Sequence, residues 1–176
     1  MERRLAPTGL VGPEGMTSKT ATIALAGIAM VAASCFQMPR YVVWNVSDSM
    51  PRGFYWIDRL PARRGDIVSV RLPDATADFA GRRAYLPKTA VLIKQVAASG
   101  GDQVCRFGTY VYINVRRRGS AQIRDRAGWP MPVWSGCRIL RAHEAFLLGH
   151  GPASFDSRYF GPIDTSRIIG QATLIW

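Results

Sequence analysis

The sequence predicts a mainly β domain that follows one N-terminal transmembrane helix. Short runs rich in β-branched and aromatic residues are separated by turns containing Gly or Pro, which is typical of a β-rich fold. The chain has 176 residues, enough for one domain with a substantial core and an anchor. We therefore expect a disordered tail over residues 1–19, a transmembrane signal-anchor over 20–38 and one folded domain over 39–176.

An uncharged stretch from Ala21 to Phe36 predicts the anchor. Apolar character continues through Met38, so the segment is at the short end of the range that spans a bilayer, about 17–25 residues. The tail before Lys19 is rich in Gly and Pro, which does not favour a helix. Three alternatives stay open: a buried core helix, a cleaved signal peptide ending at Ala32-Ala33-Ser34, and a lipoprotein signal that uses Cys35.

The protein is strongly basic, with 23 Lys+Arg against 12 Asp+Glu and a formal net charge of +11. A basic surface favours anionic lipid headgroups or nucleic acid. Here the basic residues are dispersed, and Arg116-Arg117-Arg118 is the one run. We therefore expect membrane lipid as a partner and no specific nucleic-acid site.

The cysteines and histidines do not predict a metal site. Cys35 lies inside the expected anchor, which leaves Cys105 and Cys137 as one pair in the folded domain. Two cysteines are too few ligands for structural zinc, and His143 and His150 lack zinc-finger spacing. In an oxidising compartment the two cysteines could close a loop, and two independent buried thiols are the alternative. We expect neither a metal nor a cofactor.

Alternating and apolar runs predict the elements of the domain in order. A short helix is expected over 74–86, because Pro87 stops it. Residues 116–128 are polar and predict a loop or an outer hairpin, and 138–148 is ambiguous apart from a strand-like end. The expected strands and extended segments are 41–44, 67–72, 90–98, 103–107, 110–115, 129–134 and 168–176.

Ser47 and Ser49 are the first candidate site residues. Side chains alternate along a strand, so the two hydroxyls point to the same face. Pro51 blocks further β pairing and Gly53 permits a turn, so Ser49 is expected where a strand ends, exposed on a rigid scaffold. Such a hydroxyl can act as a nucleophile. A polar strand-to-turn segment without a catalytic role is the alternative.

Lys94 is the only ionisable residue in the apolar run Ala90–Ala98. Burying an ammonium group is costly, so the pKa of this lysine is expected to fall toward neutrality. A neutral amine can serve as a general base. The alternatives are that Lys94 lies at a strand edge and reaches solvent, or that Lys88, beside Pro87 in an apparent loop, is the relevant lysine.

A third polar segment runs from Gly149 to Ile163. Asp156 and Arg158 can form an ion pair there, and Ser154 and Ser157 offer hydroxyls. An exposed, salt-bridged surface loop would also explain this composition and would contribute little to stability.

Together, these segments resemble signal peptidase I, and most closely its conjugative-transfer relatives, the TraF peptidases. The resemblance covers roughly residues 45–176 and is carried by Ser47–Tyr55, Leu92–Asp102 and Ser154–Pro162. It implies a signal-peptidase-like, β-rich catalytic domain.

The resemblance also implies roles for individual residues. Ser49 would be the nucleophile and Lys94 its general base, because a serine hydroxyl is weak until a base removes its proton. The hydroxyl of Ser47 and the backbone N–H of Ser49 would form the oxyanion hole. Ser154 would orient the lysine amine, while Asp156 and Arg158 would brace the site.

Some positions depart from the family pattern. Gly149-His150-Gly151 stands where signal peptidases have Gly-Asp-Asn, Gln95 where Arg is common and Gly100 where Pro is common. The chain also lacks the large second β-domain of general signal peptidases, which favours the compact conjugative type. Cys105 and Cys137 fit the cysteine pair of that subgroup, so the resemblance implies a disulfide.

The function implied is a membrane-anchored serine endopeptidase with a Ser/Lys dyad. It would be a single-pass protein of the bacterial inner membrane with its catalytic domain in the periplasm. Its substrate would be a secreted precursor with small residues before the cleaved bond, as in conjugative pilin maturation, and the product would be linear or cyclic. The alternatives are a general signal peptidase and a non-catalytic, membrane-tethered β-module of a secretion or conjugation apparatus.

Overall fold

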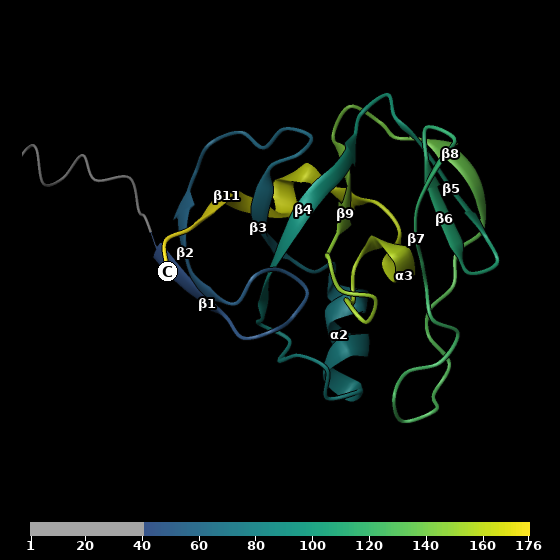
Figure 1. Ribbon diagram of the computed structural model, residues 1–176, viewed down its shortest axis with the longest axis horizontal. Coiled ribbons are helices and arrows are strands. Elements are labelled where there is room, and N and C mark those ends of the chain that lie inside the picture. Colours follow the sequence, from purple (N-terminus) through teal and green to yellow (C-terminus); the bar gives the residue numbers. More distant parts are fainter. Residues whose placement is uncertain (1–40) are drawn as a thin grey trace, which may run out of the picture. The chain divides into compact units, whose positions relative to one another are not determined.

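The computed structural model describes residues 41–176, which form two antiparallel sheets and two short α-helices (Figure 1). The mainly β prediction is therefore confirmed for the folded domain. The expected tail (1–19) and anchor (20–38) lie outside the described residues. Within 41–176, no helix is long and apolar enough to cross a membrane.

The larger sheet has seven strands in the order β1-β2-β11-β3-β4-β9-β10, and the smaller has four in the order β7-β6-β5-β8. The bounds are β1 Tyr41–Asn45, β2 Gly53–Asp58, β3 Ile67–Arg71, α2 Asp74–Arg82, β4 Val91–Ser99, β5 Gln103–Phe107, β6 Tyr110–Ile113, β7 Arg116–Ser120, β8 Gly136–Ile139, β9 Glu144–Leu148, α3 Ser157–Phe160, β10 Ile163–Asp164, the 3-10 turn η1 Thr165–Arg167 and β11 Ile168–Leu174.

Two backbone features explain where elements end earlier than expected. The helix ends at Arg82 instead of residue 86, because Ala84 takes a left-handed conformation with φ of 53°. Strand β6 ends at Ile113, because Asn114 and Val115 have φ of 48° and 61°. Two consecutive positive φ values suit a tight hairpin turn, and β7 follows directly. Residues 116–120 therefore belong to an outer hairpin.

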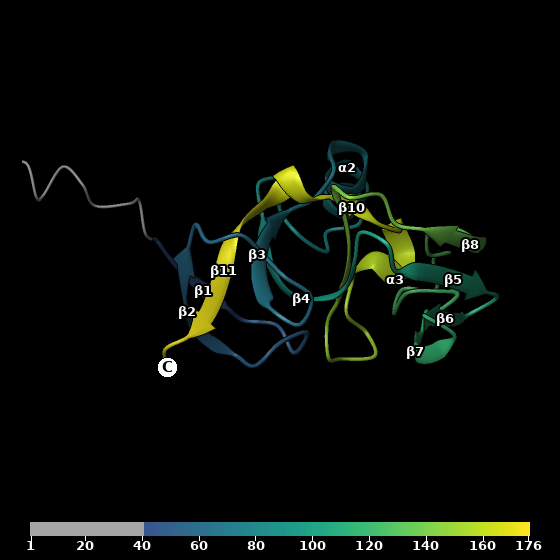
Figure 2. The ribbon, with the colours of Figure 1, turned by 90° about the horizontal axis from the view of Figure 1, so that it is seen from above.

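Three apolar clusters hold the domain together. Helix α2 packs Ala77 and Ala80 against β3, β4 and β9 of the larger sheet. A second cluster joins the two sheets, with Phe146 of β9 packed among residues of β4, β5 and β6. The third lies under β1, β2 and β11 and includes Met50, the residue after Ser49. Helix α3 lies between β9 and the smaller sheet in Figure 1, and Figure 2 shows α3 next to the smaller sheet.

A disulfide links Cys105 of β5 to Cys137 of β8, with an S–S distance of 2.01 Å. The two residues are direct register partners in the smaller sheet. The implied disulfide is thus present, and the alternative of two independent thiols is wrong.

Removing this disulfide is expected to destabilise the domain. The bond closes a loop with a sequence separation of 32, and the chain-entropy model gives about 3–4 kcal/mol for such a loop. The Cys105→Ala/Cys137→Ala variant should lower the free energy of unfolding in urea by about 2–4 kcal/mol. Reduced wild-type protein should match the variant. Equal stability of the oxidised, reduced and substituted proteins would contradict the prediction.

Candidate active site

Ser49 lies in the turn between β1 and β2. Two contacts fix this turn: the packing of Met50 in the core and a hydrogen bond from His150. Met50 is buried against Tyr55 and Ile57, which holds the chain next to Ser49 in place. The backbone N–H of His150 donates to the Ser49 carbonyl at 2.6 Å. The loop of His150 therefore covers Ser49. Ser49 is 8% exposed, whereas the sequence predicted an exposed hydroxyl.

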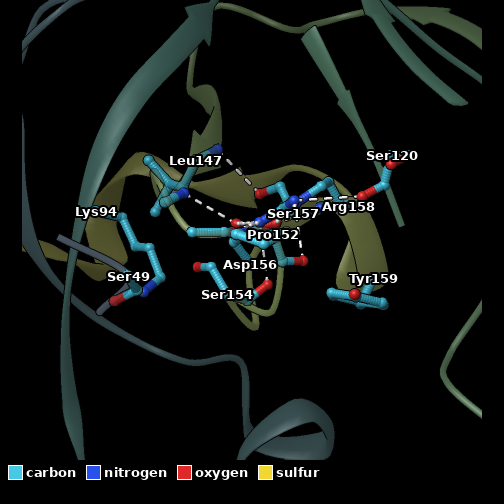
Figure 3. A network of polar contacts seen from close by, with 12 residues as sticks. Ser49, Lys94, Ser120, Leu147, Pro152, Ser154, Asp156, Ser157, Arg158 and Tyr159 are labelled. Atoms are coloured by element: carbon cyan, nitrogen blue, oxygen red, sulfur yellow. Dashed lines mark hydrogen bonds and ion pairs between the residues drawn. The ribbon is translucent and has the colours of Figure 1, made fainter. Parts of the chain in front are cut away.

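The predicted nucleophile and base are in direct contact. Lys94 Nζ donates to Ser49 Oγ at 2.7 Å, although 45 residues separate them in the chain (Figure 3). Ser47 Oγ lies 2.8 Å from Ser49 Oγ, so the two hydroxyls are side by side as expected; strand alternation is not the reason, because β1 ends at Asn45 and both serines lie in the turn. Ser47 itself is exposed and can be reached from solvent. The contact chain thus runs from a buried amine to an accessible hydroxyl.

Lys94 is buried within the larger sheet. It lies in the middle of β4, which pairs with β3 on one side and β9 on the other, and it is 3% exposed. Burial lowers the pKa of Lys94 to about 8; the negative charge of Asp156 opposes this fall, and the positive charge of Arg158 adds to it. The alternative of an edge lysine that reaches solvent is therefore wrong.

Lys88, the alternative lysine, lies next to α2 and away from Ser47 and Ser49. It forms an exposed ion pair with Asp78 at 2.7 Å, with the two side chains 66% and 47% exposed. Its amine is engaged on the surface of α2 and not with either serine.

Asp156 and Arg158 form a buried ion pair beside the Ser49–Lys94 pair. Arg158 Nε and Nη2 donate to the two carboxylate oxygens at 2.8 and 2.7 Å, and the side chains are 6% and 0% exposed for Arg158 and Asp156. Asp156 also caps the N-terminus of α3 and accepts the backbone N–H of Gly149 at 2.9 Å. The interpretation as an exposed, salt-bridged loop is therefore wrong.

Ser154 lies between the Ser49–Lys94 pair and the Asp156–Arg158 pair (Figure 3). Its hydroxyl is buried and has no hydrogen-bond partner among residues 41–176. The predicted contact between Ser154 and the Lys94 amine is thus not formed in this structure.

The segment that departs from the family pattern acts through its backbone. A Cβ atom at Gly149 would lie 2.2 Å from Ser154 Oγ and 2.8 Å from the Ser49 carbonyl oxygen, so only glycine fits this close approach. The Gly151 carbonyl accepts from Arg158 Nη2 at 2.8 Å. The side chain of His150 is exposed. In Gly149-His150-Gly151, backbone groups therefore hold the turn between β1 and β2 that carries Ser49, which we call the nucleophile turn after the predicted role of Ser49.

Three residues of the site were missed in the sequence. Arg106 of β5 is 1% exposed and donates to the Arg158 carbonyl at 2.6 Å. Trp134, in the loop before β8, donates from Nε1 to the Ser157 carbonyl at 3.0 Å, so β5 and this loop hold two successive carbonyls of α3. Asn45 makes several bonds to the nucleophile turn. An arginine between the apolar neighbours Cys105 and Phe107 in a strand was the available signal for Arg106. Nothing local distinguishes the other two residues.

The arrangement supplies the parts needed for acyl transfer. A buried amine of lowered pKa contacts a serine hydroxyl, and a second hydroxyl lies beside it. Across residues 41–176, no group of His, Cys, Asp and Glu is arranged to hold a metal ion.

Comparisons with known proteins point to one family. The model of the family described as signal peptidase, peptidase S26, matches residues 16–176. A probable conjugal transfer protein TraF of Sinorhizobium fredii is 33% identical over 163 residues, which cover 86% of this chain and 84% of the relative. A plasmid transfer protein TraF of Escherichia coli is 32% identical over 161 residues, covering 84% and 89%.

Among solved structures, a signal peptidase I of Enterococcus faecalis matches 66% of this chain and 100% of that chain, at 17% identity and a TM-score of 0.39. The family model spans the three segments that carried the resemblance, and the relatives cover most of the chain. The chain therefore belongs to the signal peptidase family, peptidase S26.

Proposed function

We propose that this protein is a membrane-anchored serine endopeptidase in which Ser49 is the nucleophile and Lys94 the general base. The observation that carries the proposal is the 2.7 Å contact between Ser49 Oγ and the amine of a lysine that is 3% exposed. A lysine can act as a base near neutral pH only when desolvation lowers its pKa, and burial does so here.

The reaction follows from these contacts. Neutral Lys94 takes the proton of Ser49 as Oγ attacks the scissile carbonyl, and the Ser47 hydroxyl and the Ser49 backbone N–H donate to the developing oxyanion. Oxyanion donors of this kind are worth about 3–4 kcal/mol each. Protonated Lys94 then gives its proton to the leaving amine, which leaves an acyl group on Ser49.

The neighbouring residues support this chemistry. Ser154 is a buried hydroxyl close to Ser49, where a rotation of its side chain would let it orient the Lys94 amine. Asp156 and Arg158 fix α3 and the Gly149 turn, so that the Ser49 carbonyl keeps its hydrogen bond to His150.

The biological substrate proposed is a secreted precursor with small residues before the cleaved bond, specifically a conjugative pilin. The names of the relatives, conjugal and plasmid transfer proteins, support this setting. The apolar segment 20–38 would anchor the protein in the bacterial inner membrane, with the catalytic domain in the periplasm and its basic groups near lipid headgroups. The disulfide is consistent with an oxidising compartment.

The full-length protein in detergent, given a fluorogenic peptide with small residues before the cleaved bond, tests this proposal. Wild type should cleave with a kcat/KM that rises with pH through about 8, because only neutral Lys94 accepts the proton. Ser49→Ala should abolish cleavage, whereas Ser135→Ala, at an exposed loop position, should not. Cleavage that survives Ser49→Ala would overturn the proposal. No cleavage by wild type would favour a non-catalytic β-module.

Mass spectrometry of the processed pilin separates two outcomes of one acylation. If the substrate's own amine resolves the acyl-enzyme, the product is cyclic and one water lighter than the trimmed linear peptide. If water resolves it, the product is linear, as expected also for a general signal peptidase.

A further inference from the structure

Asn45, the last residue of β1, is the centre of the nucleophile turn. Its side chain is buried, and Nδ2 lies 3.0 Å from each of the carbonyl oxygens of Ser47, Met50 and Pro51. An amide nitrogen has two hydrogens, so three carbonyls share them. One side chain therefore holds the start and the end of the turn that carries Ser49.

The other end of the same amide holds the Ser47 hydroxyl. Asn45 Oδ1 accepts from Ser47 Oγ at 3.0 Å and from the Ser47 backbone N–H at 3.3 Å. The second contact is an Asx-turn, in which a side chain replaces a backbone acceptor two residues back. Both contacts fix Ser47 relative to Ser49.

The direction of these bonds matters for the chemistry. A serine hydroxyl has one hydrogen, and that of Ser47 is given to Asn45 Oδ1. In the 2.8 Å contact between the two hydroxyls, Ser49 is then the donor and Ser47 the acceptor. The chain of hydrogen bonds runs from Lys94 through Ser49 and Ser47 to Asn45.

We propose that Asn45 is a positioning residue for the reaction: Nδ2 shapes the nucleophile turn, and Oδ1 holds the Ser47 hydroxyl ready for the oxyanion. This inference rests on the proposed function of Ser49 and Lys94. Ser47 is exposed, so an incoming carbonyl can reach its hydroxyl. As negative charge develops, the carbonyl oxygen becomes a stronger acceptor than the amide and takes the hydrogen bond.

Few charged and titratable groups lie around the hydrogen-bond chain from Lys94 to Asn45. Asp156 and Arg158 act on Lys94 from the α3 side. Tyr55 of β2 donates to the Pro51 carbonyl, and Asp48 and Arg52 pair on the exposed side of the turn. Asn45 itself is neutral, so a carboxylate in its place would add a negative charge at the end of the hydrogen-bond chain.

Two substitutions separate positioning from general structure. Asn45→Ser removes the three shared bonds to the turn without adding charge. Asn45→Asp also removes the donors but adds a carboxylate that favours the ammonium form of Lys94. Asn114→Asp makes the same change in charge in the exposed turn between β6 and β7, where the Asn114 amide donates to Asp102, and serves as the control away from Ser49 once rates are normalised to folded protein. Each full-length variant is assayed with the fluorogenic peptide, and rates are normalised to folded protein measured by circular dichroism.

Both Asn45 variants should lower kcat by about 10- to 100-fold with KM within about threefold of wild type, because the substrate still binds but the reacting groups are misplaced. Asn45→Asp should also move the rise of kcat/KM to higher pH by about one unit, and Asn45→Ser should not. Asn114→Asp should match wild type in both respects.

Three results would overturn this inference. They are a kcat within about twofold of wild type for Asn45→Ser, a pH profile of Asn45→Asp that overlays the wild-type profile, and loss of folding in both variants, which would make Asn45 a residue of the fold alone. A wild type that does not cleave, or a Ser49→Ala variant that does, would instead reject the proposed function itself.

Discussion

Replacing Lys94 with methionine should abolish cleavage and make the protein more stable. Because Lys94 is the proposed general base, its loss should lower kcat/KM by about 10⁴-fold or more. In the native state the ammonium of Lys94 is desolvated, and its pKa falls from 10.5 to about 8, which corresponds to roughly 3 kcal/mol of destabilisation. Methionine fills similar space without charge, so the free energy of unfolding at pH 7 should rise by about 2 kcal/mol, after loss of one hydrogen bond.

The contribution of Lys94 to the free energy of unfolding changes with pH in a definite direction. Below about pH 8 the lysine is charged in both states, so the full destabilisation is present. Between about 8 and 10.5 the unfolded chain binds more protons, so this group makes the wild type more stable as pH rises. Lys94→Met should lack that rise.

Urea unfolding followed by tryptophan fluorescence at several pH values measures the difference between variant and wild type. Lys88→Met, at the exposed ion pair with Asp78, is the control and should change stability by less than about 1 kcal/mol. A Lys94→Met protein less stable than wild type at pH 7 would contradict the prediction.

Replacing Asp156 with asparagine should destabilise the domain by about 3–5 kcal/mol, because it leaves the guanidinium of Arg158 buried without its counter-ion. The carboxylate also accepts the Gly149 N–H and caps α3, so the turn over Ser49 should loosen with it. Urea unfolding at pH 7 measures the loss.

The same variant should change the pH profile of cleavage. Asp156 raises the pKa of Lys94 and Arg158 lowers it, so removing the carboxylate should move the rise of kcat/KM to lower pH while kcat falls. Asp78→Asn makes the same chemical change in an exposed ion pair and should cost less than about 1 kcal/mol. If both substitutions lowered the free energy of unfolding equally, burial of the Asp156–Arg158 pair would not explain its contribution to stability.

The strands and the main candidate residues could be predicted because their signals are local. The apolar run around Lys94 identified a buried strand from β-branched residues and length, and it did form β4. Pro51 and Gly53 predicted a break in the strand next to Ser49, but β1 already ends at Asn45, Ser49 lies within the turn, and Gly53 begins β2. Errors occurred where tertiary contacts decide the outcome: the loop of His150 covers Ser49, and the smaller sheet buries the Asp156–Arg158 pair.

By itself, the sequence determined which reactive groups the protein has and in which elements they lie, because side-chain type and strand pattern are written in adjacent residues. Only the tertiary structure decided that Lys94 Nζ lies 2.7 Å from Ser49 Oγ and that Asn45 holds the turn that carries Ser49. The pKa of Lys94 likewise depends on what packs around it. Desolvation and hydrogen bonding act over a few ångströms in space, and the residues that supply them here lie far apart in the chain, as His150 and Ser49 do.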